Sequence, residues 1–115
     1  MPIEELKDVH VLSLAGLGAS YRMSGFFLLE SEGRTIRINF KGVAFGGHYG
    51  GHNVNIEISP QAKHKILTIE RFQHDGAIDE ILTEVQRRLL NGEMIVEFQK
   101  IKPETNDSFG GFTTG

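Results

Sequence analysis

The chain of 115 residues contains no cysteine, which excludes disulfide bridges and every zinc or redox site that depends on thiolates. It also lacks an excess of basic residues, because 12 Lys and Arg stand against 15 Asp and Glu, giving a formal net charge of −3. Proteins that bind nucleic acids usually carry a basic patch that neutralises phosphates. The charge balance therefore argues against nucleic acid as a partner.

Long hydrophobic runs are missing as well. No apolar stretch approaches the ~20 residues of a membrane-spanning helix, so we expect no insertion into a membrane. The segment Met1-Pro2-Ile3-Glu4-Glu5 is acidic and shows neither the basic nor the apolar region of a secretory signal. We therefore expect a cytoplasmic protein.

The length is typical of one compact domain, and the composition, 39% hydrophobic and 23% charged, is that of an ordinary globular protein. We expect a single β-rich domain over residues 1–103 and a flexible or docking C-terminal tail over residues 104–115. The tail is rich in glycine, threonine and polar residues. It also contains Phe109 and Phe112, which can dock on a groove of the same chain or of a neighbour.

Alternation of apolar and polar residues predicts most of the secondary structure, because side chains of a strand point to opposite faces in turn. A polar reversal with a glycine over residues 30–34 predicts a hairpin. The expected strands cover residues 9–15, 19–29, 35–41, 53–59, 65–72 and 93–101.

One amphipathic helix is predicted over residues 77–90. Asp75 is its expected N-cap, Asn91-Gly92 its expected end, and Glu84 is expected to pair with Arg88 four residues later. Its apolar stripe at helical spacing consists of Ile78, Ile81, Leu82, Val85 and Leu89.

These elements predict an α+β fold. We expect a mostly antiparallel curved sheet or partly closed β-barrel of about six strands, with the helix packed on one face.

Two registers are open for the strands on either side of residue 47. A wide loop over 42–52 places Lys41 opposite Asn53, whereas a tight turn at Gly50-Gly51 places Phe45 opposite Ile56. The second register, which we favour, requires a bulge near Gly42.

The segment 45–53 is the main candidate for function. Its glycines allow close approach of a ligand, and its aromatic side chains offer a surface for recognition at the end of a rigid sheet. We expect a non-enzymatic binding or inhibitor module that recognises a protein partner, with a homo-oligomer as one form of that assembly. The expected binding residues are Phe45, Gly46, Gly47, His48, Tyr49, Gly50, Gly51, His52 and Asn53, with help from Phe109 and Phe112 in the tail.

An alternative is a small-ligand site in the same segment. Backbone amides there can bind an anion, and His48 and His52 can contribute two ligands to a divalent metal, although catalytic zinc sites normally take three protein ligands. A small hydrolase or nuclease is a third hypothesis, but no residue pattern marks a catalytic group. We expect no cofactor beyond such a metal.

Overall fold

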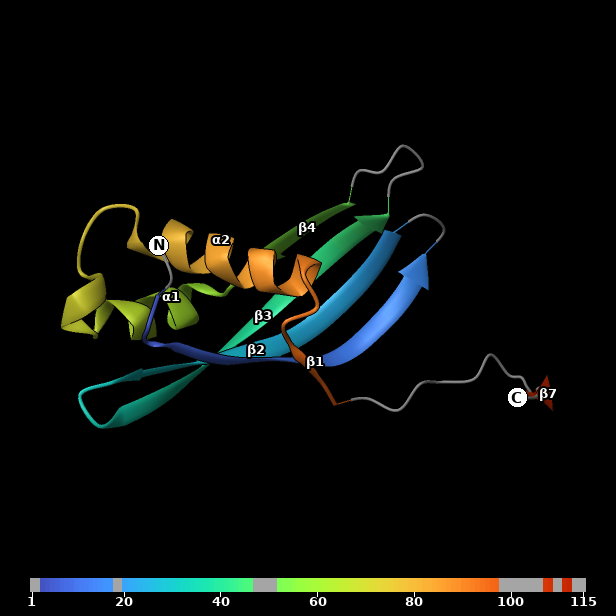
Figure 1. Cartoon of the computed structure of the whole chain (residues 1–115), viewed down its shortest axis with the longest axis horizontal. Coiled ribbons are helices and arrows are strands. Elements are labelled where there is room, and N and C mark those ends of the chain that lie inside the picture. Colours follow the sequence, from blue (N-terminus) through green and yellow to red (C-terminus); the bar gives the residue numbers. More distant parts are fainter. Residues whose placement is uncertain (1–2, 18–19, 47–51, 98–106, 109–110, 113–115) are drawn as a thin grey trace.

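The computed structural model describes residues 3–17, 20–46, 52–97, 107–108 and 111–112. Its main sheet is open and mixed, with strand order β4-β3-β2-β1-β5, and it carries two α-helices (Figure 1). The elements are β1 (Leu6–Leu17), β2 (Ser20–Ser31), β3 (Arg34–Gly46), β4 (His52–Glu57), α1 (Pro60–Leu67), the 3-10 helix η1 (Glu70–Phe72), α2 (Ala77–Leu90) and β5 (Ile95–Val96). The α+β class is confirmed, whereas this sheet has five strands rather than six and does not close.

The first four strands form an antiparallel meander. The predicted hairpin between β2 and β3 is confirmed, and its two central residues, Glu32 and Gly33, both have positive φ. Such a turn matches the right-handed twist of the two strands. The long β2–β3 ladder forms the middle of the sheet.

Strand β5 lies at the edge of the sheet opposite β4 and pairs in parallel with β1. It is shorter than the predicted strand over 93–101, of which residues 98–101 lie outside the described part. Met94 is partly buried against the core, whereas Val96 is exposed. A strand at the sheet edge has a neighbour on one side only, so less of its surface is covered.

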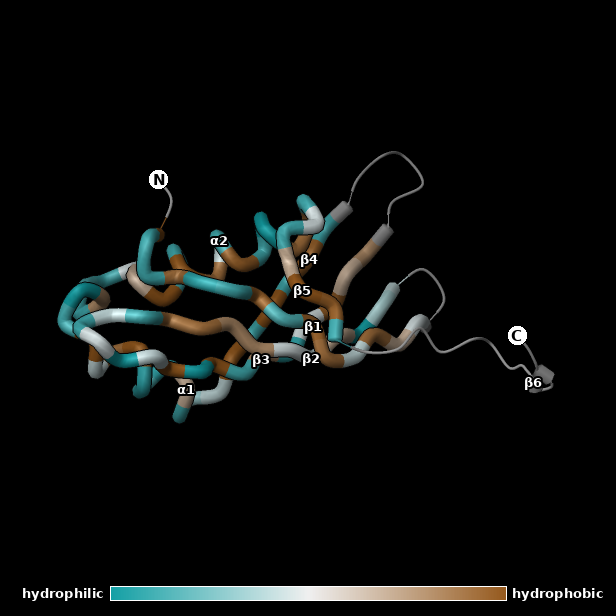
Figure 2. Tube along the Cα trace, turned by 60° about the horizontal axis from the view of Figure 1, so that its bottom comes forward, coloured by the Kyte–Doolittle hydropathy of each residue, from teal (hydrophilic) through white to brown (hydrophobic). Residues whose placement is uncertain are grey.

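The hydrophobic core lies between α2 and one face of the sheet. Figure 1 shows α2 crossing in front of the strands, and Figure 2 shows apolar stretches on the helix and on the strands beneath it. The predicted stripe of α2 is confirmed, with Ile81, Val85 and Leu89 buried and Ile78 and Leu82 partly buried. The sheet contributes Val9, Val11, Phe27, Leu29, Ile38, Phe40, Val54 and Ile56.

The predicted strand over 65–72 is wrong, because these residues form the end of α1 and then η1. The Ser59 hydroxyl accepts a hydrogen bond from the Ala62 amide at 3.1 Å, and Pro60 stands at the first helical position. Both features favour the start of a helix. Ala62 and Ile66, four residues apart, then face the core together.

The ends of α2 differ in how well they follow the prediction. The N-cap is Gly76, with φ of 83°, and no side chain caps the helix there, so the predicted Asp75 cap is wrong. At the other end Asn91 and Gly92 close the helix as expected. The left-handed backbone at Gly76 lets the chain turn sharply from η1 into α2, a role for which glycine is better suited than aspartate.

Strand β4 pairs with β3 in a register that differs from both predicted ones. Phe45 opposes Asn53, and Lys41 opposes Glu57. The wide-loop register paired Asn53 with Lys41, and the tight hairpin paired Phe45 with Ile56. Five residues, 47–51, therefore separate the two strands.

The predicted bulge near Gly42 is also wrong, because β3 pairs with β2 and β4 without a register shift. The inward series of Phe40 continues through Gly42 and Ala44. Val43 and Phe45 consequently lie on the opposite face. The sequence suggested a switch of faces because these two positions carry the larger apolar side chains.

Candidate functional site

The ends of β1, β2 and β3 extend past α2, where no helix of the described part covers them (Figure 1). Three large side chains are well exposed there: Leu14 at 42%, Tyr21 at 45% and Phe45 at 46%. We call this region, defined by Leu14, Tyr21, Phe45 and Asn53, the distal sheet end. Exposed apolar side chains gathered in one place commonly mark an interaction surface.

Strand register brings part of the distal sheet end into one apolar patch. Leu14 opposes Met23, and Tyr21 opposes Ala44, all on the face that carries α2 further along the sheet. The Tyr21 ring lies over Gly16, where an added Cβ would be 3.1 Å from the ring. Tyr21 therefore packs on one side against Gly16 of β1, while 45% of its surface stays exposed.

A register shift in β1 between Val11 and Ser13 explains why Leu14 belongs to this patch. Before the shift, odd-numbered residues such as Val9 and Val11 point to the α2 face of the sheet. After the shift, the even-numbered Leu14 points to that face, beyond the part that α2 covers. Sequence reasoning missed Leu14 and Tyr21 as site residues. The alternation of polar and apolar residues in residues 9–15 carries no clear sign of the bulge.

Four residues of the predicted binding segment are described, and the sheet brings them together. Phe45 opposes Asn53, and Gly46 opposes His52, at the ends of β3 and β4. Phe45 and Asn53 are both exposed. These two pairs fix where the segment leaves and rejoins the sheet, next to the rest of the distal sheet end.

The other predicted site residues lie mainly outside the described part of the chain: Gly47, His48, Tyr49, Gly50, Gly51 and Phe109. Phe112 belongs to β7 (Gly111–Phe112), which pairs with β6 (Asp107–Ser108) in a separate two-stranded sheet. Among the residues that the structure does describe, no three His, Asp or Glu side chains are grouped so that they could hold a metal ion. The contributions of His48 and of the tail stay predictions.

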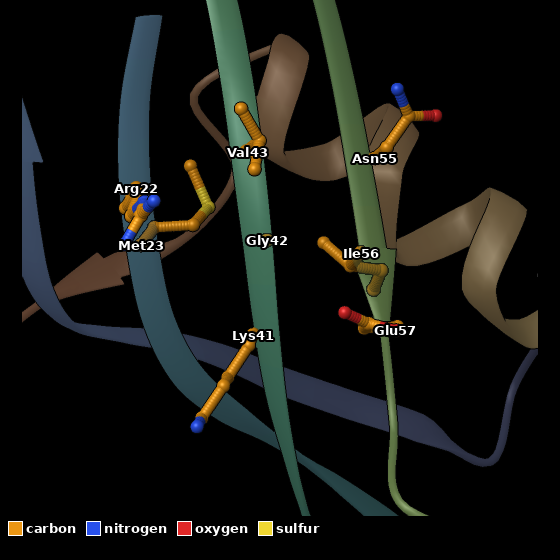
Figure 3. Close-up of a pocket in the computed structure, with 8 residues that line it drawn as sticks. All are labelled: Arg22, Met23, Lys41, Gly42, Val43, Asn55, Ile56 and Glu57. Atoms are coloured by element: carbon orange, nitrogen blue, oxygen red, sulfur yellow. The ribbon is translucent and has the colours of Figure 1, made fainter. Parts of the chain in front are cut away.

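The sheet carries a hollow of about 440 Å³ across β2, β3 and β4. Figure 3 shows Gly42 at its centre, with Met23 and Ile56 extending toward it from the neighbouring strands. An added Cβ at Gly42 would lie 2.8 Å from Ile56 Cγ2 and 3.3 Å from Met23 Cγ. Glycine at this position is therefore a packing requirement.

A second hollow of about 590 Å³ adjoins the first, because Lys41 and Glu57 line both. We call it the Arg37–Lys41 pocket. Its other lining residues are Leu12, Ser24, Gly25, Asn39, Phe40, Ile58, Ser59 and Pro60. Arg37, Asn39 and Lys41 alternate with the core residues Ile38 and Phe40, so their side chains reach the pocket from the face opposite α2.

Beside this pocket three side chains from three strands are stacked. The His10 ring lies 4.3 Å from the Phe26 ring with an interplanar angle of 11°, and the Arg37 guanidinium carbon lies 3.8 Å from the centre of the same ring. His10 Nδ1 also bonds to the carboxylate of Glu97.

Comparisons with protein-family models, with curated proteins and with solved structures found no match to this chain. Within the described residues, no helix combines the length and the apolar character that crossing a membrane requires.

Proposed function

We propose that this protein is a non-enzymatic binding module that recognises a protein partner through its distal sheet end and the adjoining segment 45–53. The observation that supports this most is the joint exposure of Leu14, Tyr21 and Phe45 around the point where that segment leaves the sheet. Rigid sheets commonly present recognition segments in this way.

The energetics favour a macromolecular partner. Full burial of a large apolar side chain contributes roughly 1.5–3 kcal/mol, so covering three half-exposed side chains offers a few kcal/mol. Tyrosine is also enriched among residues that dominate binding energy. Leu14 and Tyr21 lie on the α2 face and Phe45 lies on the other face, so a protein that wraps around this end of the sheet can cover all three side chains, whereas a small ligand reaches fewer of them.

The edge of β1 adds a second mode of contact. Beyond Val11, the side of β1 that faces β5 has no strand partner among the described residues, and residues 12–17 of this edge contain neither charge nor proline. Charged residues and proline are the usual protection of an edge strand against pairing. An extended segment of a partner can therefore add to the sheet at this edge.

The proposal is tested by capture from a lysate of the native host with the full chain and two matched variants. Leu14→Ser removes an exposed leucine from the distal sheet end, and Leu67→Ser removes one with almost the same exposure, 43%, from α1. We expect a stoichiometric partner to be retained by the wild type and by Leu67→Ser and to be lost with Leu14→Ser. Identical capture by all three proteins would refute the proposal.

A second copy of the chain is one form that the partner can take, and inhibition of the bound protein is one form that the function can take. Light scattering after size exclusion at two concentrations tests the first: a dimer that Leu14→Ser abolishes identifies the partner as a second copy. We place the protein in the cytoplasm as part of the same proposal, which cell fractionation checks.

A further inference from the structure

We propose that the Arg37–Lys41 pocket binds a small organic anion, with a carboxylate or phosphate group held between the Arg37 guanidinium and the Lys41 ammonium. The apolar part of the ligand would lie against Leu12. This site is separate from the distal sheet end and does not depend on the partner proposed above. A volume of about 590 Å³ falls within the range of ordinary ligand pockets.

The two cations, Arg37 and Lys41, lie on the same face of β3 and line the same pocket. Four residues of strand place their Cα atoms about 13 Å apart, a distance that two long side chains can close. Arg37 Nε donates to Asn39 Oδ1 at 3.0 Å, so the guanidinium is held toward the middle of this interval. In Figure 3 the Lys41 side chain points away from Val43. Both charges therefore line one cavity.

Arg37 is held in place before any ligand arrives. Its contact with the Phe26 ring and its hydrogen bond to Asn39 fix the plane of the guanidinium, and the terminal Nη groups take no part in that hydrogen bond. A fixed guanidinium loses little side-chain entropy when it binds a carboxylate or phosphate, and its planar fork matches both groups. The amide nitrogen of Asn39 supplies a further donor.

Lys41 carries the second charge, and no ion pair with another described residue neutralises it. Glu57 is its register partner on β4, yet the Lys41 side chain points away from Glu57 in Figure 3. Ser59 and Pro60, at the positive end of α1, form part of the same wall. Glu57 is the opposing feature, because its negative charge on the rim weakens the attraction for an anion.

The test is a titration of the full-length protein, followed by NMR through the backbone amides of residues 37–41 and the Nε–H signal of Arg37. Inorganic phosphate is the probe in one arm and benzoate in the other, so the arms separate a phosphate site from a carboxylate site. We expect saturable shifts confined to the pocket with at least one probe. Absence of saturation with both probes would overturn the proposal.

Matched variants assign the effect to the two cations. Arg37→Gln and Lys41→Gln are each expected to weaken binding about tenfold, since each removes a charge-assisted hydrogen bond. The controls Arg34→Gln, on the same strand, and Lys63→Gln, on α1, remove the same charge away from the pocket. Equal weakening by all four variants would contradict the proposal, because it would indicate only a general charge effect. If Arg37→Gln does not fold, the pair Lys41→Gln and Lys63→Gln decides alone.

Removal of the opposing charge provides a test of opposite sign. Glu57→Gln is expected to tighten binding of the anion about two- to threefold, the size of one screened charge interaction near a surface. Weaker binding of the anionic probe by Glu57→Gln would overturn the proposal, because it would show that attraction between the anion and the two cations does not determine binding in this pocket.

Discussion

Acid is expected to remove a defined part of the stability through Glu84 on α2. Arg87 donates to this carboxylate at 2.8 Å, and Arg88 donates at 3.2 Å while also bonding to the carbonyl oxygens of Leu6 and Lys7 on β1. The hydrogen bond from Arg87 is the main cause that lowers the pKa of Glu84 to about 2, burial acts in the opposite direction, and the hydrogen bond from Arg88 adds to the lowering. This network ties α2 to β1.

The magnitude follows from the pKa. A lowering from 4.5 to about 2 corresponds to about 3 kcal/mol, at about 1.36 kcal/mol for each pKa unit. Arg87 is 49% exposed, so solvent screens its part and we expect about 1–2 kcal/mol. Because the folded state holds the charged form, this stability is present above about pH 4.5 and is lost as the pH falls through about 2.

Urea denaturation at pH 7, 4 and 2.5 measures this effect. Glu84→Gln is expected to be less stable than the wild type by about 1–2 kcal/mol at pH 7, and the difference should shrink toward zero at pH 2.5. Glu80→Gln, an exposed position on the same helix, is the control and should stay close to the wild type. A difference that persists unchanged at pH 2.5, or an equal loss in Glu80→Gln, would refute the reasoning.

Three further stability changes follow from the packing, each measured by chemical denaturation. Gly25→Ala should cost roughly 1–3 kcal/mol or more, because an added Cβ would collide with the carbonyl oxygen of His10 and lie 2.8 Å from Phe40 Cζ; a neutral result would mean that β1 and β2 do not approach this closely. Ile81→Ala should cost about 2–5 kcal/mol by leaving a cavity under α2, where Ile81 is fully buried. Ser59→Ala should cost about 1 kcal/mol and weaken α1 by removing its cap. No change with Ser59→Ala would speak against the cap.

Sequence patterning predicted the parts of the fold in which local signals agree with each other. The strict alternation around Ile36, Ile38 and Phe40 gave β3 correctly, and the stripe through Ile81 and Val85 gave α2 with its bounds. Both patterns arise because one face of the element is buried and the other is solvated. The glycine after Glu32 predicted the hairpin for a comparable local reason.

Features that depend on tertiary contacts were missed. In residues 65–72 the apolar residues Ile66, Ile69 and Phe72 fit a strand or a helix. The decisive sign is Ser59-Pro60, which starts α1 directly after the predicted strand over 53–59. The β3–β4 register depends on whether Gly42 faces the core. That choice is set by Met23 and Ile56 filling the space above it, which no local pattern reveals.

The candidate sites show the same division. Phe45 and Asn53, at the two ends of the glycine-rich segment between the strands, were predicted as binding residues from the sequence. Leu14 and Tyr21 were not, because their exposure depends on where α2 ends and on the bulge in β1. The Arg37–Lys41 pocket also needs the structure, since strand alternation alone places these residues on a face without showing what surrounds them.

Site-specific photocrosslinking in the native host tests the central claim most directly. A benzophenone amino acid replaces Phe45 in the distal sheet end, or Leu67 on α1, two positions of similar exposure. We predict a discrete crosslinked protein, a partner or a second copy, from position 45 and none from position 67. No adduct at position 45, or the same adducts at both positions, would contradict the claim that this end of the sheet is a recognition surface.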